Sequence, residues 1–358
     1  MKYNFSEILA DETKLGKKIS QGDYLVDGQF PIIDQGQKEI AGYSNETDGL
    51  FRDVPAIIFG DHTRVLKFVN KPFFLGADGV KLLKQKRNED NAKYLFYALK
   101  NVKIPNTGYN RHFKWLKEAH IEIPKRKQQD AVVKILDSIT ALISLRQRQA
   151  EKLDELVKAR FVEMFGECKY GGDPLSNVCK LITDGTHQPP QFVDAGIPFL
   201  LVSNLVHNEI TYDTEKFISK ESYQELIKRT PVEIGDILLS IVGSYGHAGV
   251  VRTDKPFCFQ RHIAYIKPDF SKLNSEFLHQ ALLSDAVKYQ MEKRVKGIAQ
   301  KTLNLSELKK IVVPIPPLAL QTEFSHFVHE VDREKERIQR SAALLETLKR
   351  SLMQQYFG

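Results

Sequence analysis

The chain has 358 residues, of which 42% are hydrophobic and 27% charged, the composition of a globular protein with room for two domains of ordinary size. It has no run of about eighteen apolar residues and no basic, then apolar leader, so we expect a cytoplasmic protein with neither a membrane span nor a secretion signal. Lysine and arginine total 52 against 45 acidic residues, and the resulting net charge of +7 weakly favours a polyanionic partner.

The first predicted elements are short strands separated by glycine and proline. Residues 28–33 indicate a turn followed by a strand, and the apolar run 54–59 is typical of a buried strand. Residues 65–69 alternate as a half-exposed strand does. Residues 91–99 predict a short helix, with the side chain of Asn91 as its N-terminal cap.

Residues 128–166 predict one long helix. Its apolar positions alternate spacings of four and three, which indicates the seam of a coiled coil rather than the broader stripe of an ordinary surface helix. The seam positions are Val132, Leu136, Ile139, Ile143, Arg146, Ala150, Leu153, Val157, Arg160 and Met164. At about 1.5 Å per residue, such a helix forms a rod of roughly 57 Å.

The second half of the chain repeats this order. A turn and strand are predicted at 196–200, a buried strand at 234–240, a further strand at 250–251 and a short helix at 277–283. Short strands rich in β-branched residues, with a helix towards the end, predict an α+β globule built on a mixed or antiparallel sheet.

The seam also returns, 192 residues later, at Phe324, Val328, Val331, Lys335, Ile338, Ala342, Leu345, Lys349, Leu352 and Tyr356. The flanks return with it, because Gln129 matches Gln321 and Phe165-Gly166 matches Phe357-Gly358. A fixed period with the same residues at both ends indicates a duplicated unit. We therefore predict an internal pseudo-twofold repeat.

A single long helix cannot bury such a seam by itself. We predict that the two long helices pair as an antiparallel coiled coil, with register set by the polar seam residues Arg146, Arg160, Lys335 and Lys349. The alternative is that each helix packs on its own globule. The predicted fold is α+β, divided into a globular domain at 1–124, a central helix at 125–167, a second globular domain at 168–316 and a C-terminal helix at 317–358.

No pattern in the sequence indicates catalysis. The GxxxxGK[ST], HExxH and GxSxG motifs are absent. Gly243, Gly246 and Gly249 form a GxxGxxG string, but strands flank it and no helix follows, so we predict a hairpin loop rather than a nucleotide site. The three cysteines lack metal-site spacing and the ten histidines are scattered, so we predict no metal site.

The remaining polar turns carry side chains that suit DNA. Arginine pairs with guanine, asparagine and glutamine pair with adenine, and lysine and small hydroxyls contact phosphates. The predicted DNA-binding residues are Gln35, Lys38, His62, Thr63, Arg64, Tyr109, Asn110, Arg111, Thr186, His187, Ser203, Asn204, Ser244, Tyr245, Gln260, Arg261, Lys296 and Lys301.

Several motifs in this order resemble those of one family. They are the strand-to-helix joint at 308–318, the downstream Gln321, the helix ending at Phe357-Gly358, the Asp-Gly-Thr-His turn at 184–187 and the Gly-Asp-Ile-Leu strand at 235–238. Together they are similar to the specificity (S) subunit of Type I restriction–modification systems, over essentially the whole chain. The first globule departs from this pattern because it has no Asp-Gly-Thr-His turn.

The resemblance implies two target recognition domains, each reading one half of a bipartite, asymmetric DNA site. It implies that the paired helices set the unread spacer and dock two methyltransferase (M) subunits, which a restriction and translocase (R) subunit would join. S-adenosylmethionine, ATP and magnesium would belong to those partners, and this chain would be a non-catalytic subunit with no cofactor of its own. The alternative is an adaptor that binds only proteins through two domains on a coiled coil.

Overall fold

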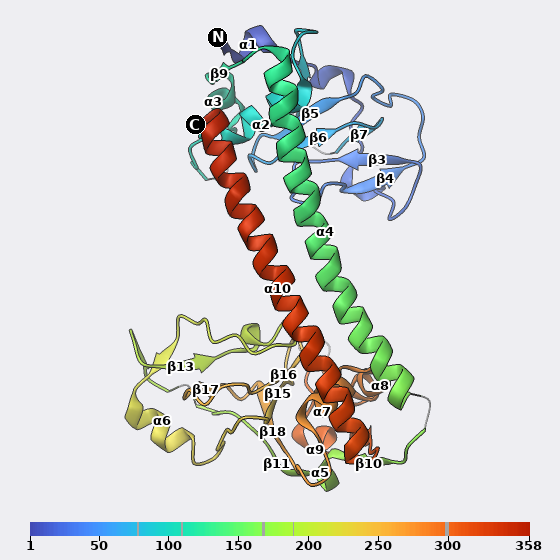
Figure 1. Ribbon diagram of the computed structural model, residues 1–358, viewed down its shortest axis with the longest axis vertical. Coiled ribbons are helices and arrows are strands. Elements are labelled where there is room, and N and C mark those ends of the chain that lie inside the picture. Colours follow the sequence, from blue (N-terminus) through green and yellow to red (C-terminus); the bar gives the residue numbers. More distant parts are fainter. Residues whose placement is uncertain (77–78, 109, 167–168, 189, 298–300) are drawn as a thin grey trace. The chain divides into compact units, whose positions relative to one another are not determined.

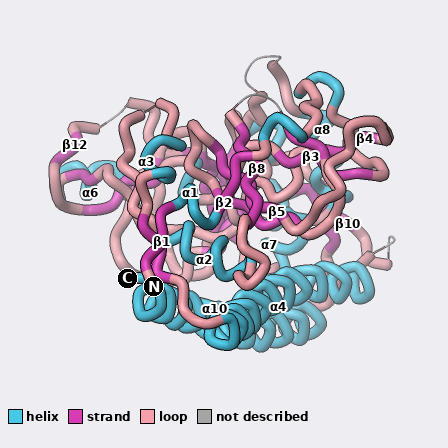
Figure 2. The backbone as a smooth tube through the Cα atoms, turned by 90° about the horizontal axis from the view of Figure 1, so that it is seen from above, coloured by secondary structure: helices cyan, strands magenta, loops and turns pink. Residues whose placement is uncertain are grey.

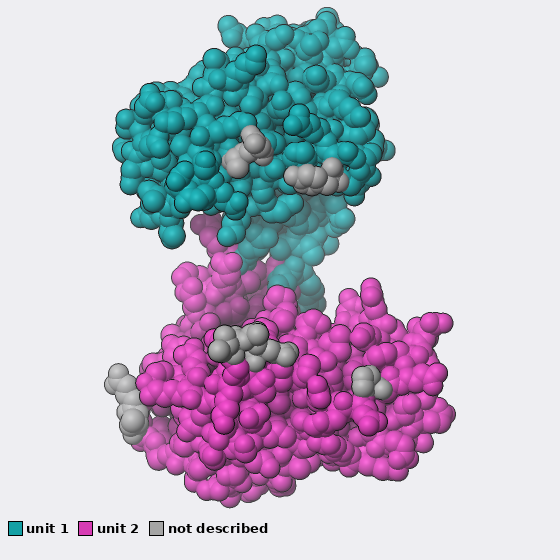
Figure 3. Space-filling view, turned by 180° about the vertical axis from the view of Figure 1, so that it is seen from behind, with its two compact units in different colours: residues 1–147, 339–358 teal, residues 148–338 magenta. Residues whose placement is uncertain are grey.

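The computed structural model describes residues 1–76, 79–108, 110–166, 169–188, 190–297 and 301–358, and its elements are labelled in Figure 1. The chain divides into two compact units, one formed by residues 1–147 with 339–358 and the other by residues 148–338 (Figure 3). Within the described residues, no helix is both long enough and apolar enough to cross a bilayer.

Unit 1 is built on two small sheets. The first has the antiparallel order β2 (Leu9–Asp11), β8 (Val80–Gln85), β5 (Ala56–Gly60) and β6 (Leu66–Val69). The second has the order β4 (Gly42–Ser44), β3 (Phe30–Ile33) and β7 (Phe74–Leu75), in which β3 and β7 are parallel. Unit 1 also contains β1 (Lys2–Asn4), paired with β9 (His120–Glu122), the helices α1 (Phe5–Ile8), α2 (Ala92–Asn101) and α3 (Phe113–Lys117), and the short 3-10 helices η1 (Thr13–Leu15) and η2 (Gln21–Asp23).

Unit 2 repeats that plan. Its antiparallel sheet has the order β11 (Cys179–Asp184), β18 (Ile263–Pro268), β15 (Ile237–Ser240) and β16 (Ala248–Val250). Its second sheet has the order β12 (Phe192–Val193), β14 (Phe217–Ile218), β13 (Ile197–Leu200) and β17 (Cys258–Phe259), in which β13 and β17 are parallel. Unit 2 also contains β10 (Gly172–Pro174), paired with β19 (Val312–Pro314), the helices α5 (Leu175–Val178), α7 (Ser275–Leu283) and α9 (Leu305–Leu308), and the 3-10 helix η3 (Val202–Asn204).

Two helices of unit 2 have no counterpart among the described residues of unit 1. They are α6 (Lys220–Leu226), between β14 and β15, and α8 (Asp285–Arg294), directly after α7. The shared strand order confirms the predicted α+β fold and internal repeat, and the added helices show that the two copies have diverged between their common strands. The predicted hairpin at 243–249 is confirmed as the connection between β15 and β16.

Each globule ends in a helix of 40 residues, α4 (Arg126–Phe165) and α10 (Leu318–Phe357), and both lack glycine and proline. In unit 1 the start of α4 shares a hydrophobic cluster with the end of α10, where Leu136 and Tyr356 both lie. In unit 2 the end of α4 packs against the start of α10, and the ring centroids of Phe161 and Phe324 are 5.6 Å apart. Because start meets end in both units, the predicted antiparallel pairing is confirmed. Figure 2 shows α4 and α10 nearly end-on, next to each other.

The seam of α4 differs from the prediction near its end. Phe161 and Phe165 are buried there, whereas Arg160 lies at the edge and pairs with Glu323 of α10 at 3.2 Å. Apolar rings displace the arginine from the interface because they lose less on leaving water than a charged group does. Lys335, another polar seam residue, bonds Asp154 of α4 at 2.8 Å. Such half-exposed pairs contribute at most about 1 kcal/mol each, so their main effect is on register.

A buried glutamine joins each long helix to its globule. In unit 2, Gln321 Oε1 accepts a hydrogen bond from Asn274 N–H at 2.8 Å, and Nε2 donates to the carbonyls of Lys272 at 2.9 Å and Pro316 at 2.8 Å. Asn274 in turn caps α7, because its side chain accepts from the first N–H groups of that helix. The amide therefore links the start of α10 to the start of α7.

The matching glutamine of unit 1 makes the same bridge. Gln129 Oε1 accepts from Asn91 N–H at 2.7 Å, and Nε2 donates to the carbonyl of Pro124 at 2.9 Å. Asn91 caps α2 with its side chain, as the sequence predicts. Both glutamines are at most 1% exposed, so their hydrogen bonds are made away from water.

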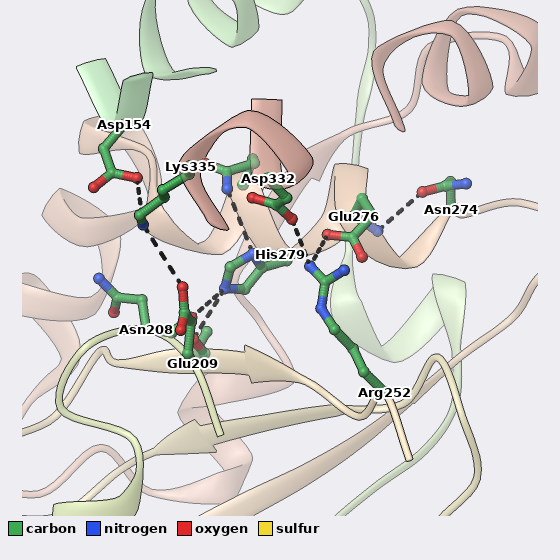
Figure 4. A network of polar contacts seen from close by, with 11 residues as sticks. Asp154, Asn208, Glu209, Arg252, Asn274, Glu276, His279, Asp332 and Lys335 are labelled. Carbon is green, nitrogen blue, oxygen red and sulfur yellow. Dashed lines mark hydrogen bonds and ion pairs between the residues drawn. The ribbon is translucent and has the colours of Figure 1, made fainter. Parts of the chain in front are cut away.

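Unit 2 has a second link to α10, drawn in Figure 4. Arg252 bonds the buried Glu276 of α7 at 3.0 Å and Asp332 of α10 at 3.3 Å. Beside them, Nε2 of His279 lies 2.9 Å from the carbonyl oxygen of Ala248. Burial lowers the pKa of His279, so the ring stays neutral and its Nε2–H donates to that carbonyl.

Replacing Gln321 by leucine tests the glutamine link. The variant leaves the N–H of Asn274 and two carbonyls buried without a partner, so we expect the free energy of unfolding to fall by about 2–3 kcal/mol. Guanidinium denaturation of the full-length chain measures it. Gln339→Leu, at an exposed position of the same helix, is the matched control, and an equal loss in both variants would contradict a specific role for Gln321.

Candidate nucleic-acid interface

In unit 1 the structure brings together predicted residues from three separate loops. Thr63 Oγ1 donates to the carbonyl of Gln35 at 2.6 Å, and the backbone N–H of His62 donates to Gln35 Oε1 at 3.2 Å. The ring Nδ1 of His62 lies 3.2 Å from the carbonyl oxygen of Asn110. Arg64 closes the β5–β6 turn with φ at 61°, a left-handed conformation that is uncommon outside glycine and asparagine.

A buried acid supports this loop cluster. Asp61 is 4% exposed, its carboxylate accepts from the backbone N–H of Phe113 at 2.7 Å, and its carbonyl accepts from the N–H of His112 at 2.8 Å. These bonds fix His112 and Phe113, which directly follow the exposed Arg111. Asp61 and its supporting role were not predicted from the sequence.

The other two predicted residues of unit 1 stand apart from that cluster. Lys38 is exposed in the loop after β3, and its carbonyl accepts from Nζ of the buried Lys67 at 2.5 Å. Tyr109 lies outside the described residues.

In unit 2 the Asp-Gly-Thr-His turn lies against the end of β17. Thr186 pairs with Gln260 as an isolated β-bridge, and the N–H of Arg261 donates to the carbonyl of Thr186 at 3.0 Å. A Cβ atom on Gly185 would collide with the carbonyl oxygens of Phe259 and Gln260. Only glycine therefore allows the two backbones to approach so closely. Four predicted residues, Thr186, His187, Gln260 and Arg261, are gathered in this way.

The aspartate of the turn supports two side chains. Asp184 is 8% exposed, and its Oδ2 accepts from His187 Nε2 at 2.9 Å. Its Oδ1 accepts from Nη2 of Arg229, a residue that follows α6 and was not predicted. No short motif indicates Arg229, because 45 residues separate it from its partner.

A pocket of about 360 Å³ opens between this turn and the end of α6. Thr186 and His187 line one side, Leu226 and Arg229 the other, and Cys258 belongs to its lining from β17. Burial raises the pKa of the Cys258 thiol to about 12, so the sulfur stays protonated and is a poor nucleophile. The pocket is therefore suited to binding rather than to covalent chemistry.

A separate cluster forms around the β15–β16 hairpin. The N–H of Gly243 donates to the carbonyl of Lys301 at 2.8 Å, and Lys301 Nζ lies 5.9 Å from the ring of Tyr245. Lys296 pairs with Thr302 beside them. Ser244 Oγ lies 3.1 Å from Nε2 of His247. A hydroxyl, an aromatic ring and two lysines at one loop are the groups that contact a phosphate backbone.

The predicted pair Ser203 and Asn204 divides into one exposed and one buried residue. Asn204 is 6% exposed, accepts from the N–H of Leu201 at 2.9 Å and donates to the carbonyls of Thr211 and Asp213 at 2.9 Å. Its amide is committed to holding the loop, whereas Ser203 is exposed. Within the described residues, no group of three or more His, Cys, Asp or Glu side chains is placed to hold a metal ion.

Comparison with known proteins identifies the family. The family model of the Type I restriction modification DNA specificity domain matches residues 6–155 and 178–346. The chain belongs to this family.

The chain is also similar in sequence to individual specificity subunits. The EcoBI specificity subunit of Escherichia coli is 30% identical over 177 residues, which cover 48% of this chain and 37% of that protein. The chain thus matches little more than a third of that relative's length. The MjaVIII specificity subunit of Methanocaldococcus jannaschii is 23% identical, over 76% of this chain and 72% of that protein.

Solved structures show the same fold. The Type I restriction–modification S subunit from M. genitalium superimposes with a TM-score of 0.58 at 16% identity, covering 100% of this chain and 96% of that one.

Substituting Gly185 by alanine tests the close approach in the turn. The added methyl group must displace the backbone of 184–187 or of β17, so we expect a loss of about 1–3 kcal/mol in the free energy of unfolding. Thermal unfolding with a matched Gly171→Ala control measures it, since a Cβ at Gly171 meets nothing within 4 Å. Equal stability of the two variants would show that the turn has room for a side chain.

Proposed function

We propose that this chain is the DNA-recognition subunit of a Type I restriction–modification enzyme. Each globule reads one half of a bipartite, asymmetric site in double-stranded DNA, and the chain itself carries out no catalysis. The observation that carries the proposal is a common strand order in two copies whose polar loops differ. A shared scaffold with divergent loops is what two readers of different sequences require.

The composition of the loop clusters supports DNA rather than a protein partner. They combine arginine, lysine, hydroxyl and amide groups, which match phosphates and base edges. Family membership and the net charge of +7 agree with that assignment. Protein-binding surfaces are instead depleted of lysine and centred on aromatic anchors.

In this proposal the paired helices set the separation between the two recognition domains. They also dock two methyltransferase subunits. Restriction and translocase subunits complete the enzyme in the cytoplasm. S-adenosylmethionine, ATP and magnesium belong to those partners. The antiparallel packing of α4 and α10 in each unit supports the role of the helices, because a paired helix bends less than a single one.

The first test is DNA binding by the full-length chain with its methyltransferase subunits. We expect one bipartite sequence to be preferred, and the affinity to fall by several orders of magnitude between about 50 and 200 mM salt, because phosphate contacts release counterions. Fluorescence anisotropy on a randomised duplex library measures both. Binding that ignores sequence and salt would favour the adaptor alternative.

A heptad deletion tests the spacer role. Removing residues 141–147 from α4 and 341–347 from α10 keeps the seam in phase and shortens each rod by about 10 Å. At about 3.4 Å per base pair, we expect the unread spacer to shorten by about three base pairs while both half-sites keep their sequences. Methylation mapping of a host carrying the variant measures the spacer, and an unchanged spacer with altered half-sites would contradict the proposal.

A further inference from the structure

Arg229 occupies a place that has no counterpart among the described residues of unit 1. It lies in the turn after α6, a helix with no counterpart among the described residues of unit 1, and its side chain is half exposed at the pocket beside the Asp-Gly-Thr-His turn. An arginine at the edge of a recess is partly shielded from water, so contacts it makes there are stronger than on a flat surface.

The arginine is held by a buried and well-supported acid. Asp184 ends β11 and pairs with Ala264 of β18, so its backbone is part of the four-stranded antiparallel sheet of unit 2. Its carboxylate binds Nη2 of Arg229 on one oxygen and Nε2 of His187 on the other. Two partners on opposite oxygens restrict the rotation of the carboxylate, and hence the direction of the guanidinium.

This anchoring changes which ligand suits the arginine. The negative charge of Asp184 offsets that of Arg229, which weakens the long-range attraction to phosphate. The directional donors remain, because Nε and Nη1 of Arg229 have no hydrogen-bond partner among the described residues, and Nη2 carries a second N–H besides the one that Asp184 accepts. That second N–H and the neighbouring Nε or Nη1, whichever lies on its side, are parallel donors in one plane. Such a pair fits the two acceptors O6 and N7 of guanine, whereas adenine offers one acceptor and one donor at that edge.

We propose that Arg229, positioned by Asp184, reads a guanine in the half-site recognised by unit 2. The inference rests on the proposed function and adds to it a specificity-determining residue and the base it reads. His187 completes the arrangement as the second group that orients the carboxylate.

The test compares Arg229→Ala with Lys228→Ala in the full-length chain with its methyltransferase subunits. Lys228 is the neighbouring exposed cation and pairs only with Glu225 among the described residues, so its variant removes the same charge without touching Asp184. On a randomised duplex library, we expect Arg229→Ala to lose about five- to 150-fold of the preference for guanine at one position, with the other positions unchanged. Lys228→Ala should keep the preference at every position.

Asp184→Asn separates positioning from folding. It keeps the guanidinium but removes its counter-charge and its anchor, so we expect weaker discrimination at the same position together with tighter binding to unrelated DNA. A variant that merely misfolds would lose both, and circular dichroism detects that case.

Three outcomes would overturn the inference. Arg229→Ala could weaken all sequences equally and lower the salt slope by about one, which marks a phosphate contact. It could leave binding and preference unchanged, or it could relax a position other than guanine. If the wild-type chain itself shows no sequence preference, the proposed function fails, which is a result distinct from any of these.

Discussion

The buried glutamine at the start of each long helix is the interaction on which the rest of each unit depends. Gln129 and Gln321 each tie three backbone segments together: the strand that leaves the globule, the helix that begins there and the capped start of a second helix. A side-chain amide carries two N–H donors and a carbonyl acceptor in one plane, so one group can serve all three segments. Burial makes these bonds costly to lose, so each globule stays at one angle to its own helix.

In each unit a second buried group, an aspartate, supports the polar loops that differ between the two units. Asp61 in unit 1 and Asp184 in unit 2 are both under 10% exposed and both organise the candidate DNA-facing loops. They do so differently: Asp61 binds backbone groups and shapes a loop, whereas Asp184 binds the side chains of His187 and Arg229 and directs them. The two copies of the scaffold thus present different candidate DNA-facing loops, because the two aspartates lie at different positions in the equivalent sheets.

Much of the fold could be predicted because it depends on local patterns. The apolar run before Gly60 became β5, the polar cap at Asn91 begins α2, and the four-and-three spacing became two helices of 40 residues. The prediction was wrong where packing overrides spacing: Phe161, one residue beyond the expected Arg160, enters the core because aromatic rings from α7 and α10 meet it there. Asn204 was likewise predicted to bind DNA because an asparagine side chain can pair with a base, but in the structure it is buried.

The sequence by itself therefore determined the duplication, the α+β class, the long helices and the chemical character of the loops, since each is a property of neighbouring residues. Only the tertiary structure decided which loop residues meet. Arg229 reaches Asp184 across 45 residues, and Gln35 meets His62 across 27, because strands that pair in a sheet return distant loops to one place. No spacing in the chain encodes such a meeting, since it depends on strand order, register and the length of every connection between them.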